Sequence, residues 1–297
     1  MKKMLKNLLT ERQIMFLRAV RRGTGDIFRK AMVSLINAMP SGFLLAIKSN
    51  AEIVKKMDYK ERDIFLNINS DIEYRVRLHS CAKEPEMITW IQDFMKEGDV
   101  LYDVGANVGA YSLVASKYFN GRVRVYAFEP GFMTFVELCR NIITNECQDS
   151  IIPLQVALSD KTVMDTFNYN NLTPGGALHA FGKPLDCKGE TFAPVFRQPV
   201  LSYRIDDLIK QFGIPAPNHI KIDVDGIEYK VLEGASGALK SAALRSVIAE
   251  LEEGSAEADR IIGLMSRNGF IVHSRHRYTY GGNDGPYAAM HNYIFKR

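Results

Sequence analysis

Apolar runs alternate with amphipathic stretches along the chain from about residue 84 onward. Five apolar runs are predicted as buried strands, and helical spacing of apolar positions predicts helices between them. The expected strands are 100–103, 123–128, 151–156, 219–224 and 246–251. The expected helices are 84–96, 110–118, 132–145, 203–212, 227–239 and 256–268. Two further strands, 270–273 and 292–295, are expected to pair antiparallel. Strands that alternate with helices are typical of an α/β fold with a mostly parallel sheet.

The first part of the chain has a different pattern. Residues 31–60 are predicted to be helical, with a break near Pro40. The runs 64–68 and 72–78 are predicted as two strands joined by a turn, because the second run alternates apolar and polar residues.

Charge is unevenly distributed. Residues 1–60 carry thirteen Lys and Arg against four Asp and Glu, a net of +9, whereas the remaining 237 residues carry 25 against 30, a net of −5. We therefore expect a basic, mainly helical N-terminal extension over 1–61 and a catalytic α/β domain over 62–297. Between Leu5 and Val20, apolar residues recur at helical intervals among basic ones. This pattern fits a helix on an anionic membrane or a partner, or one packed on its own domain or a second copy. The latter is favoured, since a helical pattern does not select its target.

Composition limits the remaining classes. The chain is 46% hydrophobic and 24% charged, which is ordinary for a globular protein. Its four cysteines include no C-x-x-C pair, so free thiols in a reducing compartment are expected. No apolar run of 18 residues is present, so we expect a cytoplasmic protein, with peripheral membrane contact through residues 1–60 as an alternative and the oligomeric state open. With a net charge of +4 and no groove motif of basic and aromatic residues, nucleic acid is not expected as a partner.

A glycine loop follows the first strand of the α/β region. The apolar run ends at Asp103, and Gly105 and Gly109 stand before the next helix. Glycine permits sharp turns and a close approach of the backbone to a ligand. Twenty residues after Gly109, the second strand ends in Glu129. This order is typical of a nucleotide-binding βαβ unit, whose acid accepts hydrogen bonds from ribose hydroxyls.

The loop does not fit a dinucleotide well. A dinucleotide fingerprint requires G-x-G-x-x-G, whereas with Gly109 at its second glycine position, Asn107 and Ser112 stand at the first and third. S-adenosylmethionine has no phosphate but has an α-ammonium group, for which Asp103 is a suitable partner.

At this point the sequence resembles the class I S-adenosylmethionine-dependent methyltransferases, and more narrowly the FkbM-type family. The matching motifs stand in the family's order: DVGANVG at 103–109, FEP at 128–130, VALSD at 156–160 and KIDVDGIE at 221–228. The resemblance covers roughly residues 85–297. It implies a Rossmann-like sheet of seven strands, mostly parallel with an antiparallel C-terminal pair, and helices on both faces. It also implies S-adenosyl-L-methionine as cofactor, with these cofactor-binding residues: Asp103, Gly105, Asn107, Gly109, Glu129, Pro130, Ala157, Ser159 and Asp223. Ser159 is equally well explained as a turn residue.

Acids gather at the carboxyl end of the fourth strand, where ligands of open α/β sheets bind. Asp223, Asp225 and Glu228 stand there, and Glu250 lies near the end of the fifth strand. Methyl transfer to a hydroxyl needs a group that orients the hydroxyl or removes its proton. Asp223 or Asp225 is the preferred candidate, Glu250 the second, and Glu228 is assigned to substrate binding. Asp225 replaces the family's more usual Glu. Asp225 and Glu228 are alternatively explained as capping the next helix. No metal site is predicted from these acids.

The segment 168–198 loses periodicity and is predicted to be a lid or substrate-binding insert. His179 within it is a candidate base or substrate-binding residue, and Tyr278, Tyr280 and Tyr287 line an acceptor site or pack a loop. The Asn-Pro-Pro-Tyr type of motif used by amino-group methyltransferases is absent, which favours oxygen.

The sequence therefore favours an O-methyltransferase, and the resemblance implies a hydroxyl of a saccharide or secondary metabolite as acceptor. Two alternatives stay open. A non-catalytic scaffold docked through its basic arm would not need Asp103, Glu129 and Asp223 together, and an NAD-type oxidoreductase would need the missing glycines, so both are disfavoured. Binding of S-adenosylhomocysteine, of NAD or of neither separates the three.

Overall fold

The computed structural model describes residues 27–28, 30–185, 189–277 and 289–297. The chain divides after Glu52 into two compact units. The domain assignment to 1–61 and 62–297 stays a prediction. The larger unit contains the sheets and is described first.

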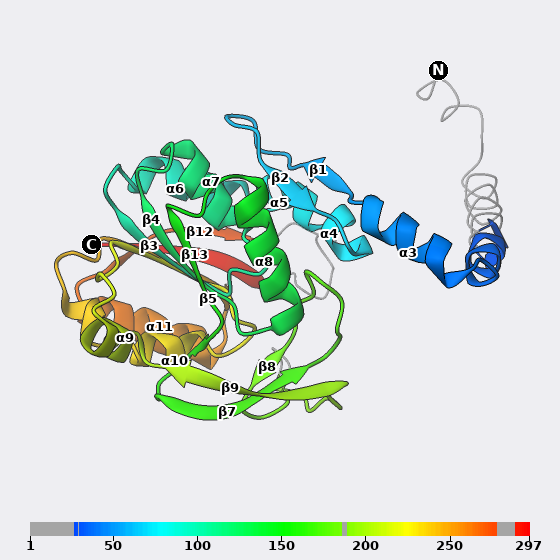
Figure 1. The fold of residues 1–297 in the computed structure, drawn as a ribbon. Coiled ribbons are helices and arrows are strands. Elements are labelled where there is room, and N and C mark those ends of the chain that lie inside the picture. Colours follow the sequence, from blue (N-terminus) through cyan, green and yellow to red (C-terminus); the bar gives the residue numbers. More distant parts are fainter. Residues whose placement is uncertain (1–26, 29, 186–188, 278–288) are drawn as a thin grey trace, which may run out of the picture. The chain divides into compact units, whose positions relative to one another are not determined.

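A seven-stranded sheet forms the centre of the larger unit (Figure 1). Its order is β12-β13-β11-β10-β3-β4-β5, and every neighbouring pair is parallel except those made by β13, which runs antiparallel to both β11 and β12. This confirms the predicted α/β fold with its antiparallel C-terminal pair. The strands are β3 (Val100–Val104), β4 (Arg124–Phe128), β5 (Ile151–Leu154), β10 (His219–Ile222), β11 (Ser246–Glu252), β12 (Ile271–Arg277) and β13 (Met290–Lys296).

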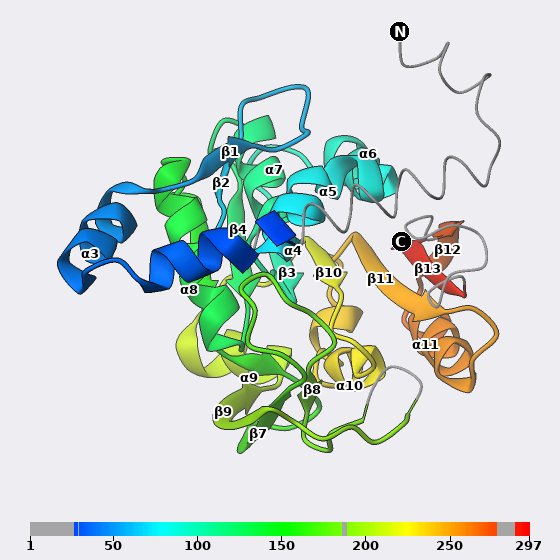
Figure 2. The same cartoon turned by 90° about the vertical axis from the view of Figure 1, so that its right-hand side faces the viewer.

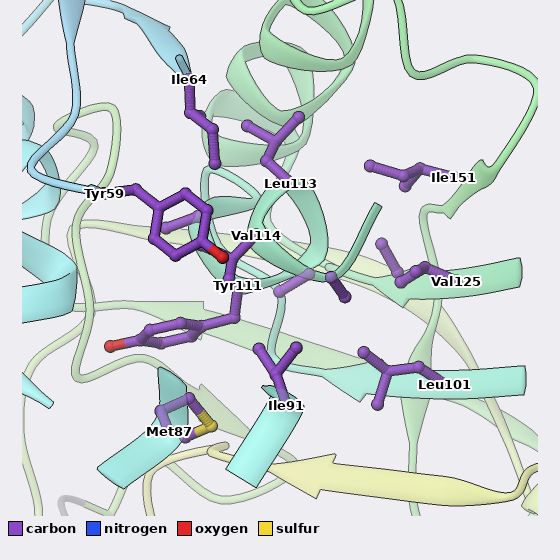
Figure 3. Close-up of a cluster of buried hydrophobic side chains, with 14 of the residues drawn as sticks. Tyr59, Ile64, Met87, Ile91, Leu101, Tyr111, Leu113, Val114, Val125 and Ile151 are labelled. Atoms are coloured by element: carbon purple, nitrogen blue, oxygen red, sulfur yellow. The ribbon is translucent and has the colours of Figure 1, made fainter. Parts of the chain in front are cut away.

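Helices cover both faces of this sheet because its strands are apolar on both sides. Leu101 belongs to a core cluster with α6 and α7, whereas the next residue, Tyr102, belongs to a second cluster with α9 and α11. Figure 3 shows Leu101, Val125 and Ile151 of adjacent strands in the first cluster, near Leu113 of α7. The helices are α6 (Pro85–Phe94), α7 (Ala110–Tyr118), α8 (Phe132–Thr144), α9 (Ile205–Phe212), α10 (Glu228–Glu233) and α11 (Ala256–Arg267).

A second, four-stranded sheet has the order β6-β9-β7-β8. Its strands are β6 (Ala157–Leu158), β7 (Val163–Tyr169), β8 (Ala180–Phe181) and β9 (Phe196–Tyr203), and Figure 2 shows β7, β8 and β9 grouped together. The expected irregular insert over 168–198 therefore begins and ends in paired strands. The helix predicted over 203–212 begins at Ile205 as α9, and Ser202 lies inside β9, where it donates to the carbonyl of Lys161.

The segment 72–78 was predicted as a strand, and this prediction is wrong. It forms α4 (Asp71–Arg75) and a 3-10 turn, η1 (Arg77–His79), followed by α5 (Ser80–Lys83). Ser70 caps α4 by accepting a hydrogen bond from the backbone N–H of Glu73. Such a cap stabilises the start of a helix by about 1 kcal/mol, so this segment forms a helix although its alternation of apolar and polar residues is typical of a strand. The strand that pairs with β2 (Phe65–Asn67) is instead β1 (Val54–Lys56), in a region expected to be helical.

The described part of the smaller unit is helical, with the predicted break at Pro40. A helix over Lys30–Asn37 is followed by α3 (Ser41–Asn50). No single helix among the described residues is long and apolar enough to cross a membrane; these two pass such a test only as a pair, bent by 118°. The helix predicted between Leu5 and Val20 lies outside the described residues.

Candidate active site

A cavity of about 360 Å³ opens at the carboxyl ends of β3, β4 and β10. This volume lies within the usual range of small-molecule sites, about 300–1,000 Å³. Nine of the predicted site residues line it: Gly105, Asn107, Glu129, Pro130, Ala157, His179, Asp223, Asp225 and Glu250. Asp103, Gly109, Ser159 and Glu228 are not among its lining residues.

The glycine loop brings the end of β3 against the end of β10. A Cβ on Gly105 would stand 1.8 Å from the carbonyl oxygen of Asp223, and the φ of Gly105 is +75°. No other residue type fits both conditions. Gly109 caps α7 at φ +85°, and a Cβ there would stand 2.6 Å from the side chain of Leu138. Packing therefore accounts for both glycines, and only Gly105 borders the cavity.

Glu129 lies at the end of β4 with its carboxylate held by the backbone. Oε2 accepts the N–H of Asn107 at 3.0 Å, and Oε1 accepts the N–H of Gly131 at 2.8 Å. Burial raises the pKa of Glu129 to about 7, although these two hydrogen bonds favour the charged form. The glycine loop and the acid thus form one unit at the cavity wall.

A buried ion-pair cluster lies beneath the loop. Lys221 Nζ lies 3.2 Å from Asp103 Oδ1 and 3.5 Å from Asp223 Oδ2, and it donates to the carbonyl of Gly105 at 2.8 Å. Burial alone would lower the pKa of Lys221, but the two acids raise it. Asp103 also accepts the hydroxyl of Ser112 at 2.6 Å. Asp103 therefore does not line the cavity but pairs with Lys221, which in turn bonds the backbone of the glycine loop.

The pKa values of the three candidate bases are shifted in different directions. Burial favours the neutral form of Asp223, but Lys221, Lys83 and Arg77 outweigh it and lower its pKa. Burial and the neighbouring Asp223 raise the pKa of Asp225 to about 6. Burial and Asp223 raise the pKa of Glu250 well above its usual range. The environment thus favours the ionised form of Asp223 and the neutral form of Glu250.

Asp225 also holds the backbone of the lid segment. It stands at φ +58°, a conformation that costs a non-glycine residue free energy, and its Oδ2 accepts the N–H of Leu178 at 2.8 Å. Asn107 contributes similarly, because its Nδ2 donates to the carbonyl of Gly176 at 2.8 Å. The lid is therefore bonded to two residues that were predicted for cofactor and catalysis.

Glu228 and Ser159 lie outside the cavity wall. The Glu228 carboxylate accepts the N–H groups of Gly226 at 3.1 Å and Val224 at 3.3 Å, as expected for an acid at the start of a helix. Burial raises its pKa to about 8. Ser159 donates to Asp160 at 2.9 Å within its turn. Their assignments to substrate and cofactor binding stay predictions.

His179 lines the cavity in its neutral form. Burial and the cation of Arg77 lower its pKa to about 4. The ring packs at 5.6 Å from Phe167 and 5.1 Å from Tyr169, between ring centroids. It is therefore placed better for packing or hydrogen bonding than for holding a positive charge.

Sequence reasoning missed the cations at the site. Arg77 and Lys83 line the cavity from the segment mistaken for a strand and the helix after it. Arg77 also donates twice to the carbonyl of Gly175, at 2.8 and 3.0 Å. Lys221 had a signal, namely a lysine inside an apolar strand next to an acid. The predicted acceptor tyrosines at 278, 280 and 287 lie outside the described residues.

No group of three or more His, Cys, Asp or Glu side chains in the described ranges has an arrangement that could hold a metal ion.

Together, the strand order, the glycine loop after β3 and the acid ending β4 define a Rossmann-like protein of the class I methyltransferase type. A family profile described as the methyltransferase FkbM domain matches residues 103–272. The chain therefore belongs to the FkbM methyltransferase family.

Several similar proteins are named as methyltransferases. The hexuronic acid methyltransferase AglP of Haloferax volcanii is 29% identical over 178 residues, which are 60% of this chain and 66% of that protein. The 31-O-demethyl-FK506 methyltransferase FkbM of Streptomyces tacrolimicus is 27% identical over 210 residues, 64% of this chain and 79% of that protein. A solved methyltransferase FkbM from Methylobacillus flagellatus aligns with a TM-score of 0.48 and 14% identity, over 71% of this chain and 48% of that one.

Proposed function

We propose that the protein transfers a methyl group from S-adenosylmethionine to a hydroxyl of a saccharide or secondary-metabolite acceptor. The observation that carries this proposal is the set of three acids, Asp223, Asp225 and Glu250, on the same cavity as Glu129. The named activities of the two relatives support it, since one acts on a hexuronic acid and the other on a demethylated oxygen of FK506.

The chemistry of the cavity wall suits the cofactor. The Glu129 carboxylate would accept hydrogen bonds from ribose hydroxyls, and the apolar wall of Phe128 and Leu158 would cover the adenine ring. The ionised Asp223 would attract a cationic group. We assign the β3–β4 side of the cavity to the cofactor on these grounds.

The bound cofactor supplies an activated methyl group, so the chain has to orient the acceptor and accept its proton. A carboxylate oxygen of Asp223 or Asp225 is suited to hold the acceptor hydroxyl. Asp225, with a pKa of about 6, is the stronger base of the two. Burial and Asp223 raise the pKa of Glu250, and in its neutral form Glu250 would donate a hydrogen bond instead.

The acceptor side is assigned to the lid segment and its neighbours. Asn171, His179 and Phe181 offer a polar group, a neutral imidazole and an aromatic face. Arg77 and Lys83 add positive charge to the same cavity. This combination suits a hydroxylated acceptor with a ring face.

Calorimetric titration of S-adenosylhomocysteine into the full chain tests the cofactor assignment. We expect micromolar binding by the wild type and its loss in Glu129→Ala, because the ribose would lose its acceptor. Glu233→Ala, at an exposed acid in α10, is the matched control and should bind like the wild type. Absence of binding by a folded wild type would refute the proposal, and unchanged binding by Glu129→Ala would refute the assignment of Glu129.

A further inference from the structure

The two helices of the smaller unit expose apolar side chains along their length. Between Lys30 and Asn50, most residues are exposed, and none is buried. The exposed large apolar side chains there are Met32, Val33, Leu35, Ile36, Phe43, Leu45 and Ile47. Leu35 is 54% exposed and Leu45 is 64% exposed. Leucine side chains prefer burial by roughly 1.5–3 kcal/mol each, so this surface needs a cover.

The apolar side chains are not confined to a narrow stripe. In α3, Phe43, Leu45 and Ile47 are exposed. Because each residue is rotated by about 100° from the one before it, these three side chains spread over more than half of the helix circumference. A flat protein face covers one side of a helix, whereas a fluid apolar medium surrounds most of it. The distribution therefore favours lipid over a second copy of the chain.

The charges on this helix pair have one sign. The stretch 31–47 contains no charged residue, and Arg29, Lys30 and Lys48 flank it. No acid occurs between residues 27 and 51. Basic residues beside an apolar segment favour a surface of anionic headgroups, where each contributes to binding.

We propose that the helix pair 30–50 inserts its apolar side chains into the headgroup and upper acyl layer of an anionic bilayer and thereby holds the enzyme at a membrane surface. The bend of 118° between the two helices suits a shallow insertion rather than a crossing. This inference does not depend on the acceptor or on the assignment of any residue in the cavity.

Flotation of the full chain with vesicles tests the proposal. We expect binding to vesicles of phosphatidylglycerol and phosphatidylcholine, and at least several-fold weaker binding to phosphatidylcholine alone or at high salt. Leu35→Asp and Leu45→Asp, one in each helix, should each lower the partition coefficient about tenfold or more. Ile143→Asp is the matched control, because Ile143 is 68% exposed on α8, outside the helix pair, and it should change the coefficient less than about twofold.

Circular dichroism of each variant establishes folding without reference to cofactor binding. Failure of the folded wild type to float with anionic vesicles would overturn the proposal, as would equal flotation of Leu45→Asp and the wild type. Light scattering in solution provides the other arm. A wild-type dimer that Leu45→Asp dissociates, without change in vesicle binding, would assign the surface to a second copy of the chain and would also overturn the proposal.

Discussion

Replacement of Lys221 by methionine tests the ion-pair cluster beneath the glycine loop. Lys221 and Asp103 are 3% and 1% exposed in their side chains, and the 3.2 Å between Nζ and Oδ1 excludes an intervening water. Asp103 Oδ1 makes no hydrogen bond within the described residues, so the cation of Lys221 is what compensates it. Methionine preserves the length of the side chain but removes its charge.

The expected cost is large for one substitution. Removing one partner of a buried ion pair costs about 3–5 kcal/mol, because the other charge stays in a medium that solvates it poorly. Asp223 is 34% exposed in its side chain, so water compensates it in part and most of the cost falls on Asp103. We therefore expect Lys221→Met to lower the free energy of unfolding by about 3 kcal/mol at pH 7.

Urea unfolding followed by circular dichroism measures this difference. Lys230→Met, at an exposed lysine of α10, should stay within about 0.5 kcal/mol of the wild type. The pKa of Asp223 is lowered, so the stability it gains from Lys221 is present above its ordinary pKa of 3.8 and is lost as the pH falls through its folded pKa. The part of the gap that comes from Asp223 should therefore stay constant from pH 7 to about 4 and narrow only as the pH falls below 3.8. A loss below about 1 kcal/mol at pH 7 would refute the argument.

Two further predictions concern the loop and the start of α10. Gly105→Ala should give much less folded protein than Gly98→Ala. Both glycines have a positive φ, but a Cβ at 105 would stand 1.8 Å from the carbonyl oxygen of Asp223, whereas one at 98 would meet nothing within 4 Å. Soluble yield and thermal unfolding measure the difference, and equal behaviour of the two variants would contradict the prediction. Glu228→Gln should gain stability relative to the wild type as the pH rises from 5 to 8. The pKa of Glu228 is raised from 4.5 to about 8, so the stability that the protonated side chain contributes is fully present below pH 4.5 and is lost as the pH rises through about 8. Urea unfolding at three pH values measures the gap, whose upper limit is about 5 kcal/mol from 1.36 kcal/mol per unit of pKa; a gap independent of pH would show that Glu228 is ionised at pH 5.

The central sheet could be predicted because its signals are local. Each parallel strand is a short apolar run bounded by a helix pattern, as in 219–222 and 246–252, and the antiparallel end of the sheet was also expected. The segment 72–78 was mispredicted as a strand because its apolar and polar residues alternate. The helix cap that decides against a strand is a single hydrogen bond between Ser70 and Glu73, three residues apart, which is a weaker signal in the sequence. The second sheet was missed because β7 pairs with β9 across an insert that shows no periodicity of its own.

The site could be predicted in part. The strand-end acids and the glycine loop sit where the fold class places ligands, so Gly105, Glu129 and Asp223 were expected at the cavity. The cations Arg77 and Lys83 approach from a segment that lies before the glycine loop in the sequence. Nothing in their local pattern predicts a contact with that loop, because the contact depends on how the intervening helices fold.

Hydrogen bonds to the backbone of the 168–198 segment limit how the cavity can change its shape. Asn107 and Asp225 bond the backbone of this segment at Gly176 and Leu178, so a shift of the segment would also displace two residues that line the cavity. New specificities would have to arise where a side chain reaches the cavity without such bonds, as Phe181 does, whereas Asn171 accepts the N–H of Thr173 and donates to the carbonyl of Ala177. In a directed-evolution library, substitutions at Phe181 should therefore be tolerated far more often than substitutions at Asn107, Asn171 or Asp225.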